Sequence, residues 1–324
     1  MANVVAQFED IASALRDASS IAIACHVNPD GDALGSALGA SLALRKAGKQ
    51  TAVSWDDPVV KIPASYAFLP GGDHVVAPDQ MPSADVFLAL DCGGLDRLGS
   101  LEVTATASPC LVNIDHHPGN TDFGKLNAVI TSASSTAELV AQLIGVLGIE
   151  LDRDIATCLY TGIVTDTGRF QYVNSTPDTL RLAADLLAYD VPASEIAVEV
   201  FESAPFGYLK LVGRLLERAT LDSDQRLVYS WITRADLTES KVAKDETDKL
   251  IDFLRSIRDA EIAAIFKEQE DGRFRVSMRS KGPRSVGAIA RANGGGGHEL
   301  AAGFSADTID AAIAAITTGL QQPE

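Results

Sequence analysis

The sequence predicts an α/β protein in which a domain built on a parallel sheet precedes a smaller α/β domain. Short apolar strands alternate with helical patterns through the first 190 residues. Continuous apolar strands between helices are typical of a parallel sheet with helices on both faces. A chain of 324 residues, of which 46% are hydrophobic, is long enough for two domains with a sizeable core.

The first domain is expected over residues 1–190. Its strands are the apolar runs at 21–26, 51–55, 85–91 and 110–115. Its helices are the segments with helical patterns at 32–47, 134–148, 152–165 and 177–189. In open sheets of this kind, functional sites form just beyond the carboxyl ends of the strands.

A helical linker is expected over 191–222, with a break near Pro205 and Gly207. The smaller domain then covers 223–324. Its strands are expected at 226–233, 261–267 and 273–278. Its helices are expected at 245–258, 285–292 and 308–319.

The charge distribution argues against binding to duplex DNA. The net charge is −17, whereas duplex-binding proteins are normally basic because phosphate neutralisation drives their affinity. Residues 1–222 carry a balance of −15, and residues 223–324 carry −2. The segment 273–291 holds six basic residues and no acid. An acidic part can hold cations and a basic segment can hold an anion, although acidity can also serve solubility alone.

The sequence predicts a cytoplasmic protein without membrane contact. No apolar run reaches the about 18 residues that a membrane span needs. The N-terminus lacks the basic and apolar regions of a signal peptide. The four cysteines have no CxxC spacing, which favours reduced thiols over disulfides or a zinc site: Cys25, Cys92, Cys110 and Cys158.

Aspartate and histidine side chains gather where four apolar segments end. They are His26, Asp30, Asp32, Asp91, Asp115, His116, His117 and Asp166. Buried carboxylates are costly unless something neutralises them, and a pair of divalent cations would do so. Imidazole with carboxylate suits Mn²⁺, Fe²⁺, Co²⁺ or Zn²⁺ better than Mg²⁺ or Ca²⁺, and the lack of a cysteine ligand favours manganese.

Asp91 stands alone on its strand and is the natural carboxylate to bridge two ions, which together can activate a water between them. Each residue also has a simpler interpretation. Asp32 can cap a helix, His116 or His117 can be a core histidine, and Asp91 can begin a turn. Such residues stand at the ends of four separate apolar segments. Helix caps, turns and core histidines do not readily explain all four together, which favours the metal site.

The motifs resemble those of a known superfamily. "HVNPDGDALGS", "LALDCGGLDRLG", the DHH triplet at 115–117 and "GIVTDTGRFQY" resemble the four motifs of the DHH phosphoesterases, in order and spacing. "GGGGHELAAGF" is similar to the signature of the associated DHHA1 domain. The whole chain most resembles the short-oligonucleotide nuclease and pAp phosphatase group (nanoRNase-like), which includes actinobacterial members acting on cyclic dinucleotides.

The resemblance implies a role for each residue of the first domain. One manganese would be held by His26, Asp30 and Asp91. The other would be held by Asp32, Asp91, His116 and Asp166. His117 would face the scissile phosphate or help to protonate the leaving oxygen, and Asp115 would orient the histidines. Mg²⁺, Co²⁺ or Fe²⁺ could take the place of manganese.

The second domain is expected to hold a phosphate of the substrate. Arg279 and Ser280 end a strand, and arginine can grip phosphate bidentately. Before His298 stand four glycines, whose backbone N–H groups can approach an anion: Gly294, Gly295, Gly296 and Gly297. His298 could add a donor or stack on a base. The simpler interpretation is a flexible glycine turn with His298 as a bystander.

Two departures from the family pattern concern substrate preference. Asn293 stands where the family often has a phenylalanine, and "PRSVG" replaces a stretch that often holds an aspartate. These departures concern base stacking and substrate preference, and the expected phosphate-holding role does not depend on them.

We expect a phosphoesterase that binds small nucleotides or short single-stranded RNA between its domains. The substrates would be two-to-five-nucleotide RNA, pApA, cyclic di-AMP or pAp, and a homodimer is expected because related proteins often dimerise. A RecJ-like exonuclease would need a basic channel with stacking aromatics, and aromatics are 6% here. A manganese pyrophosphatase would carry different C-terminal motifs. A nucleotide sensor would have lost ligands that this chain keeps.

Overall fold

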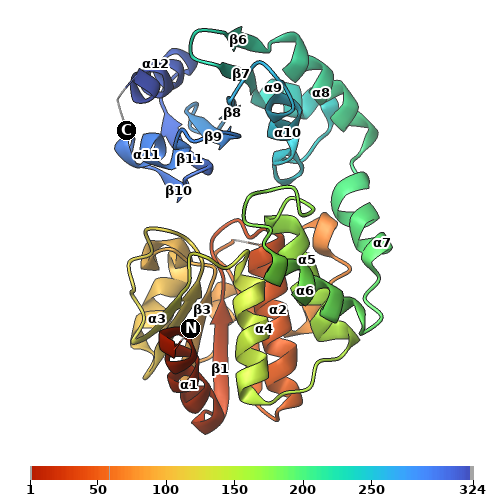
Figure 1. Cartoon of the computed structure of the whole chain (residues 1–324), viewed down its shortest axis with the longest axis vertical. Helices are drawn as coiled ribbons and strands as arrows, with labels where there is room; N and C mark the ends of the chain where they lie inside the picture. Colours follow the sequence, from red (N-terminus) through yellow and green to blue (C-terminus); the bar gives the residue numbers. More distant parts are fainter. Residues whose placement is uncertain (1, 58, 322–324) are drawn as a thin grey trace. The chain divides into compact units, whose positions relative to one another are not determined.

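The chain divides into two compact units, Met1–Ser203 and Ala204–Glu324 (Figure 1). This computed structural model describes residues 2–57 and 59–321, so the last three residues of the expected second domain lie outside the described residues. The division falls within the expected linker, 191–222, and the domain limits given above stay a prediction. Each unit has its own sheet and its own core.

The sheet of the first unit has five parallel strands in the order β2-β1-β3-β4-β5. They are β1 (Ser20–Ala24), β2 (Gln50–Ser54), β3 (Val86–Leu90), β4 (Leu111–Asp115) and β5 (Leu126–Val129). The first four were predicted, within about two residues at each end, as is usual for such boundaries. The edge strand β5 was not, because it has only four residues and is half-exposed. Strand β2 lies on one side of β1 and strand β3 lies on the other side. This reversal of strand order creates a topological switch point.

Helices cover both faces of this sheet, as expected. On one face lie α1 (Ala2–Asp17), α2 (Gly31–Lys46), α4 (Thr136–Leu147) and α5 (Arg153–Asp166), with α6 (Pro177–Leu187) packed against α5. On the other face lie η4 (Leu95–Leu101) and α3 (Glu102–Ala107). Helices α2, α4 and α5 pack against one another (Figure 1).

Helices α2 and α5 meet almost backbone to backbone. Gly31, Gly35 and Gly39 follow one another at every fourth position of α2, and all three face α5. A Cβ atom at Gly35 would collide with the backbone oxygen of Cys158. A Cβ atom at Gly162 of α5 would lie 2.6 Å from Ala137 Cβ and 2.9 Å from Asp32 Oδ1. Glycine therefore allows α5 to lie directly beside the Asp32 carboxylate.

The connecting segments are short helices. Between β2 and β3 lie η1 (Ala64–Tyr66), η2 (Gly72–His74) and η3 (Pro78–Gln80). After α6 come α7 (Ala193–Ala197) and the π-helical turn η5 (Val198–Glu202). Helix α8 (Phe206–Glu217) begins directly after Pro205, where the sequence predicted a break.

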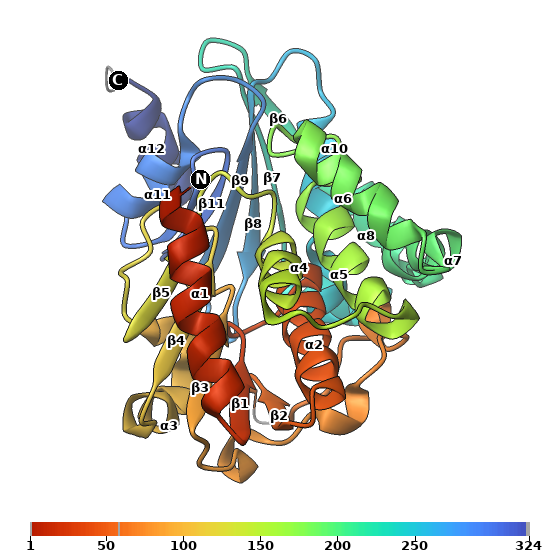
Figure 2. The ribbon, with the colours of Figure 1, turned by 60° about the horizontal axis from the view of Figure 1, so that its bottom comes forward.

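The second unit holds a mixed sheet in the order β10-β11-β9-β8-β7-β6. Its strands are β6 (Thr220–Asp222), β7 (Leu227–Ile232), β8 (Ile262–Glu268), β9 (Phe274–Ser280), β10 (Gly296–His298) and β11 (Ala301–Ala306). Figure 2 shows α11 (Val286–Ala292) and α12 (Ile309–Gln321) on one face of this sheet. Helices α8 and α10 (Leu250–Arg255) cover the opposite face.

Some elements of the second unit differ from the expectation. The helix expected at 245–258 is divided into η6 (Lys244–Thr247) and α10, since the buried apolar residues of this stretch begin only at Leu250. Helix α9 (Arg234–Ser240) and strands β6, β10 and β11 were not predicted. Strand β11 reads "AAGFSA", which has no β-branched residue to mark it. Within 2–57 and 59–321, no helix combines the length and the apolar character that crossing a membrane requires.

Candidate active site

The predicted residues of the first unit meet at the carboxyl edge of its sheet. His26 lies two residues after β1, Asp91 directly follows β3, and Asp115 ends β4 with His116 next. Strands β1, β3 and β4 are neighbours in the sheet. The side chains therefore gather beside the switch point between β1 and β3, where open α/β sheets bind ligands.

Asp91 lies at the centre of the group. Its Oδ2 atom is 3.4 Å from His26 Nε2, and its Oδ1 atom is 3.7 Å from His116 Nε2. The residue is 3% exposed, and its φ of 60° lies in the left-handed region that few non-glycine residues adopt. Burial raises the pKa of Asp91, but the hydrogen bond with His26 and the charges of the nearby histidines lower it by more. A histidine thus faces each oxygen of this carboxylate.

Asp30 begins α2 next to His26. Its Oδ1 atom accepts hydrogen bonds from the backbone N–H groups of Asp32 and Ala33, each at 3.0 Å. The same oxygen lies 3.9 Å from His26 Nε2. The simpler interpretation of Asp32 as the helix cap is therefore wrong, because Asp30 caps this helix.

Asp32 points from the first turn of α2 toward the first turn of α4. Its two oxygens accept hydrogen bonds from the N–H groups of Thr136 at 2.7 Å and Ala137 at 2.9 Å. His116 Nε2 lies 3.8 Å from Asp32 Oδ2. Burial, followed by the charges of Asp91 and Asp166, raises the pKa of Asp32 well above its usual range. A cation among these carboxylates would offset both effects.

Asp166 reaches the same place from the last turn of α5. Its Oδ2 atom is 3.7 Å from His116 Nε2. Beyond it the chain turns through three successive left-handed residues, Gly168 (φ 55°), Arg169 (φ 63°) and Phe170 (φ 61°). This turn returns the chain so that Asn174 Nδ2 donates to Asp166 Oδ2 at 3.2 Å and to the backbone oxygen of Ser134 at 2.8 Å.

Asp115 and His117 form a hydrogen-bonded pair. His117 Nδ1 lies 2.7 Å from Asp115 Oδ1, and Asn120 Nδ2 donates to the other Asp115 oxygen at 2.6 Å. His117 Nδ1 is also 3.5 Å from Asp91 Oδ1. Burial lowers the pKa of His117, but the hydrogen bond with Asp115 and the charges of both aspartates raise it by more, to about 10.

These residues have the chemistry of a divalent-cation site. Ligand atoms of His26, Asp30 and Asp91 lie within 4.8 Å of one another, as do those of Asp32, Asp91 and His116. In the part of the chain that the structure describes, neither Asp32 nor Asp91 forms an ion pair with a lysine or arginine. The two sets share Asp91, and their carboxylate and imidazole donors suit first-row divalent metals. The residues present therefore fit a pair of cations.

In the second unit, the structure brings Arg279 and His298 to one row of the sheet. Arg279 on β9 pairs with Ala301 on β11, which in turn pairs with His298 on β10. Directly opposed residues present their side chains on the same face, so the two lie about 10 Å apart across two strand spacings. Ser280 differs, because its buried hydroxyl donates to the backbone oxygen of Gly282 at 3.2 Å.

The glycine run joins α11 to β10. Gly294 (φ 72°) ends the helix in a left-handed conformation, and Gly297 (φ 126°) lies in the edge strand itself. A Cβ atom at Gly295 would collide with the backbone oxygen of Gly303. Gly296 is exposed and has nothing within 4 Å of its Cβ position. The backbone conformation requires glycine at Gly294 and Gly297, and close packing requires it at Gly295, whether or not the run binds an anion.

Sequence reasoning missed three residues that hold the site together: Asn120, Thr136 and Asn174. Each is a single polar residue that contacts an aspartate named above. Asn120 follows the DHH triplet closely, and Asn174 follows Asp166 by eight positions. No spacing rule marks them, since their contacts depend on how the loops return to the sheet edge.

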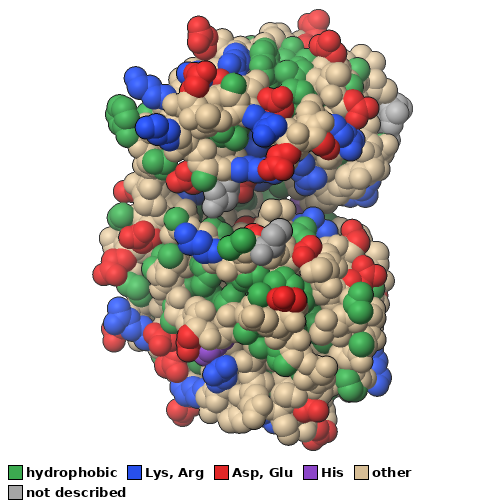
Figure 3. Space-filling view, turned by 180° about the vertical axis from the view of Figure 1, so that it is seen from behind, with side chains coloured by type: hydrophobic (Ala, Val, Ile, Leu, Met, Phe, Trp, Pro, Cys, Tyr) green, Lys and Arg blue, Asp and Glu red, His purple; other side chains and the backbone are tan. Residues whose placement is uncertain are grey.

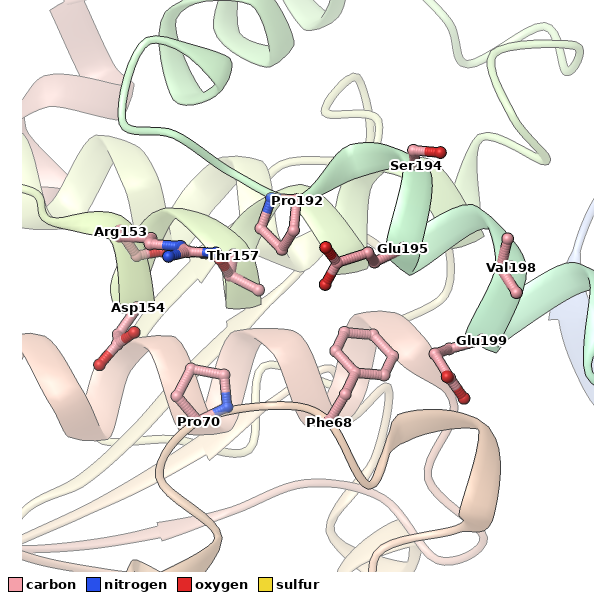
Figure 4. Close-up of a pocket in the computed structure, with 10 residues that line it drawn as sticks. All are labelled: Phe68, Pro70, Arg153, Asp154, Thr157, Pro192, Ser194, Glu195, Val198 and Glu199. Atoms are coloured by element: carbon pink, nitrogen blue, oxygen red, sulfur yellow. Dashed lines mark hydrogen bonds between the residues drawn. The ribbon is translucent and has the colours of Figure 1, made fainter.

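A cavity of about 480 Å³ in the first unit contains none of the predicted residues. Figure 4 shows Phe68 and Pro70 on one side of it and Pro192 and Glu195 on the other. Its charged residues include Arg153 and two glutamates, but it lacks histidine. It therefore lacks the ligand set found at the sheet edge.

Comparison with known protein families gives two matches that together span most of the chain. The family described as "DHH family, N-terminal domain" matches residues 20–163. The family described as "DHHA1 domain" matches residues 224–322. The first match covers the sheet that carries the aspartates and histidines, and the second covers the sheet that carries Arg279 and His298.

Similar proteins and structures agree with these matches. The bifunctional oligoribonuclease and PAP phosphatase NrnA of Thermus thermophilus is 36% identical, over 90% of this chain and 85% of that protein. The protein of the same name from Bacillus subtilis is 32% identical, over 92% and 94%.

Among solved structures, an exopolyphosphatase-related protein from Bacteroides fragilis has a TM-score of 0.88 at 27% identity, covering 98% of this chain and 96% of that one. RecJ of Thermus thermophilus with Mn²⁺ has a TM-score of 0.57 at 14% identity, covering 99% of this chain and 55% of RecJ, which shows the fold alone. With both domains matched and the DHH residues gathered at one sheet edge, the chain belongs to the DHH family of phosphoesterases.

Proposed function

We propose that this DHH-family phosphoesterase hydrolyses short oligoribonucleotides and dinucleotides to mononucleotides, and pAp to AMP. The proposal is supported by the relatives named bifunctional oligoribonuclease and PAP phosphatase, which align with nearly the whole chain. The observation that carries it is the position of Asp91, whose two oxygens face His26 at 3.4 Å and His116 at 3.7 Å. One carboxylate can thereby serve two cations.

Two Mn²⁺ ions would be held by six residues of the first unit. One set is His26, Asp30 and Asp91. The other is Asp32, Asp91, His116 and Asp166. Bound divalent cations supply Lewis-acid stabilisation of charge on phosphate oxygens and lower the pKa of water. The choice of manganese rests on the mixed imidazole and carboxylate donors.

His117 would donate a proton to the leaving oxygen. Its Nδ1–H is directed at Asp115, 2.7 Å away, so Nε2 is the nitrogen assigned to the substrate. The Asp115 carboxylate beside Nδ1 favours the protonated ring, the form that a general acid requires. Asp115 orients the ring and stabilises its charge, and Asn120 holds Asp115.

The second unit would bind the rest of the nucleotide. Arg279 would grip a phosphate, the backbone N–H groups of Gly294–Gly297 would approach it, and His298 would donate to it or stack on a base. The common face of Arg279 and His298 supports this assignment. Ser280 would contribute by shaping the turn that follows Arg279.

No contact among the described residues favours a RecJ-like exonuclease, a manganese pyrophosphatase or a nucleotide sensor. The likeness to RecJ concerns the fold, and a nucleotide sensor would not need the full set of ligands. Cytoplasmic location and a homodimer stay parts of the proposal. The first rests on the four cysteines, all of which are free thiols.

The test is a product analysis with Mn²⁺ against pAp, pApA, cyclic di-AMP and five-nucleotide RNA. We expect mononucleotide products, no turnover after chelation by EDTA, and recovery when Mn²⁺ is restored. Asp91→Ala should lose both bound metal and turnover. Metal stoichiometry that is unchanged in Asp91→Ala would overturn the assignment of the bridge. Absence of turnover on all four substrates would overturn the proposed specificity.

A further inference from the structure

Thr136, the first residue of α4, contacts two of the aspartates at once. Its backbone N–H donates to Asp32 Oδ2 at 2.7 Å, and its hydroxyl donates to Asp91 Oδ1 at 2.9 Å. These aspartates belong to α2 and to the end of β3, and Thr136 is fully buried. One residue therefore links two carboxylates that come from distant parts of the chain.

The hydroxyl of Thr136 is used differently from those of the threonines in α5. Thr157, Thr161 and Thr165 each donate to the backbone oxygen four residues earlier in their own helix, at 2.7 to 2.8 Å. Thr136 is the first helical residue after the cap Ser135, so no helical carbonyl lies four residues before it. Its hydroxyl instead leaves the helix and reaches Asp91.

We infer that Thr136 is a positioning residue that fixes the orientation of the Asp91 carboxylate and its spacing from Asp32. The terminal torsion of an aspartate has a broad energy profile, so an isolated carboxylate can rotate. A hydrogen bond to one lone pair of Oδ1 restricts this rotation and leaves the other lone pair for a cation. Partners of this kind typically change metal affinity or activity about 10- to 100-fold when they are removed.

This inference rests on the proposed metal site, and the test separates the two. Mn²⁺ is titrated into the metal-free full chain by calorimetry, for the wild type, Thr136→Val and Thr136→Ser. Valine keeps the shape and the N–H bond to Asp32 but removes the hydroxyl, whereas serine keeps the hydroxyl. Thr161→Val is the matched control, because it removes a fully buried hydroxyl whose partner is only a backbone oxygen.

We expect Thr136→Val to weaken Mn²⁺ binding about 10- to 100-fold, while Thr136→Ser stays within about threefold of the wild type. The melting temperatures of metal-free Thr136→Val and Thr161→Val should fall by similar amounts, and Thr161→Val should bind Mn²⁺ as the wild type does. Thr136→Ala removes the same hydroxyl and provides the measurement if valine prevents folding.

Equal Mn²⁺ affinity of Thr136→Val and Thr161→Val would overturn the inference while leaving the metal site intact. Equal weakening by valine and serine would also overturn it, since the hydroxyl would then not be the cause. A wild type that binds no Mn²⁺ would overturn the proposed site and this inference together.

Discussion

Asp115 Oδ1 and His117 Nδ1 lie 2.7 Å apart, and Asn120 holds the other Asp115 oxygen at 2.6 Å. Asp115 is fully buried, whereas His117 is half-buried. The chain thus places a buried carboxylate, with a hydrogen-bond partner on each oxygen, behind a partly exposed imidazole. Such a pair fixes which ring nitrogen faces a substrate, as carboxylates do behind metal-binding histidines elsewhere.

Asp115→Asn and His117→Ala should both lower kcat about 10²-fold or more, because the first removes the carboxylate that orients the proton donor and the second removes the donor itself. Mn²⁺ stoichiometry should stay at the wild-type value, since neither residue belongs to the proposed ligand sets. Single-turnover hydrolysis of pApA and calorimetric titration of Mn²⁺ provide the two measurements. A lost metal ion in Asp115→Asn would show that this residue holds the cations rather than the imidazole.

Arg279→Ala should lower kcat/KM on dinucleotides about 10- to 100-fold, the effect of losing a charge-assisted hydrogen bond to phosphate. The wild type should also prefer two to five nucleotides over twenty-four. The net charge is −17, and the acidic side chains on the face in Figure 3 are interspersed with Lys and Arg. The excess of negative charge should repel a long strand within a Debye length of about 8 Å.

The matched control for Arg279 is Arg273→Ala on the same hairpin. Arg273 pairs with Asp307 at 2.9 Å, so its loss changes the net charge equally without removing the proposed phosphate contact. Hydrolysis of 5′-labelled RNAs of graded length, under single-turnover conditions, checks both variants. Equal rates for the longest and shortest wild-type substrates would contradict the expected length preference.

Asp236 in the second unit should make stability depend on acid. Burial raises the pKa of Asp236, but the Arg218 guanidinium and the Thr233 N–H and hydroxyl lower it by more, well below the usual range. A carboxyl with a depressed folded-state pKa stabilises the fold above its unfolded pKa of about 3.9, and this contribution is lost as the pH falls through the folded value.

Asp236→Asn should therefore destabilise the second unit by about 3 kcal/mol at pH 7, because it leaves Arg218 without its charged partner. The difference between wild type and variant should shrink steadily below pH 4. Urea unfolding at several pH values, monitored in the full chain, measures it. A difference that does not vary with pH would show that the carboxylate's charge contributes nothing.

Gly162→Ala should destabilise the first unit by about 1–3 kcal/mol and weaken metal binding, because the new methyl group would lie 2.6 Å from Ala137 Cβ and 2.9 Å from Asp32 Oδ1. Gly145→Ala on α4 is the control. Its Cβ would meet nothing within 4 Å, so alanine should stabilise that helix by about 0.5–1 kcal/mol. Thermal melts and Mn²⁺ titrations of both variants distinguish overcrowding from a general effect of losing glycine.

Much of this arrangement could be predicted from sequence, because strong local patterns produced it. Continuous apolar runs marked β1 to β4, and the residues that follow parallel strands must meet at one sheet edge. His26, Asp91 and His116 were placed together on that basis, and Asp91 does lie within 4 Å of each of the two histidines.

The remaining parts of the site and of the fold depend on contacts between residues far apart in the sequence, which leave no local pattern. Thr136 reaches Asp91 across 45 positions, and Asn174 reaches Ser134 across 40. Strand β11 contains mostly small residues, and its pairing with β9 and β10 leaves no mark in its own sequence. Ser280 was predicted to bind substrate together with Arg279 because the two are adjacent in sequence. Adjacent residues of a strand point to opposite faces, and the Ser280 hydroxyl donates to Gly282.

The three glycines of α2 also affect the order in which the first unit can fold. Each glycine lowers helix stability by about 0.8–1 kcal/mol relative to alanine, so a helix carrying Gly31, Gly35 and Gly39 has low intrinsic helicity. An isolated peptide covering 27–48 is expected to show little helix by circular dichroism. We therefore expect α2 to become stable as it docks on α5, which would place Asp30 and Asp32 late. Cations in the medium are then expected to bind after the unit has packed.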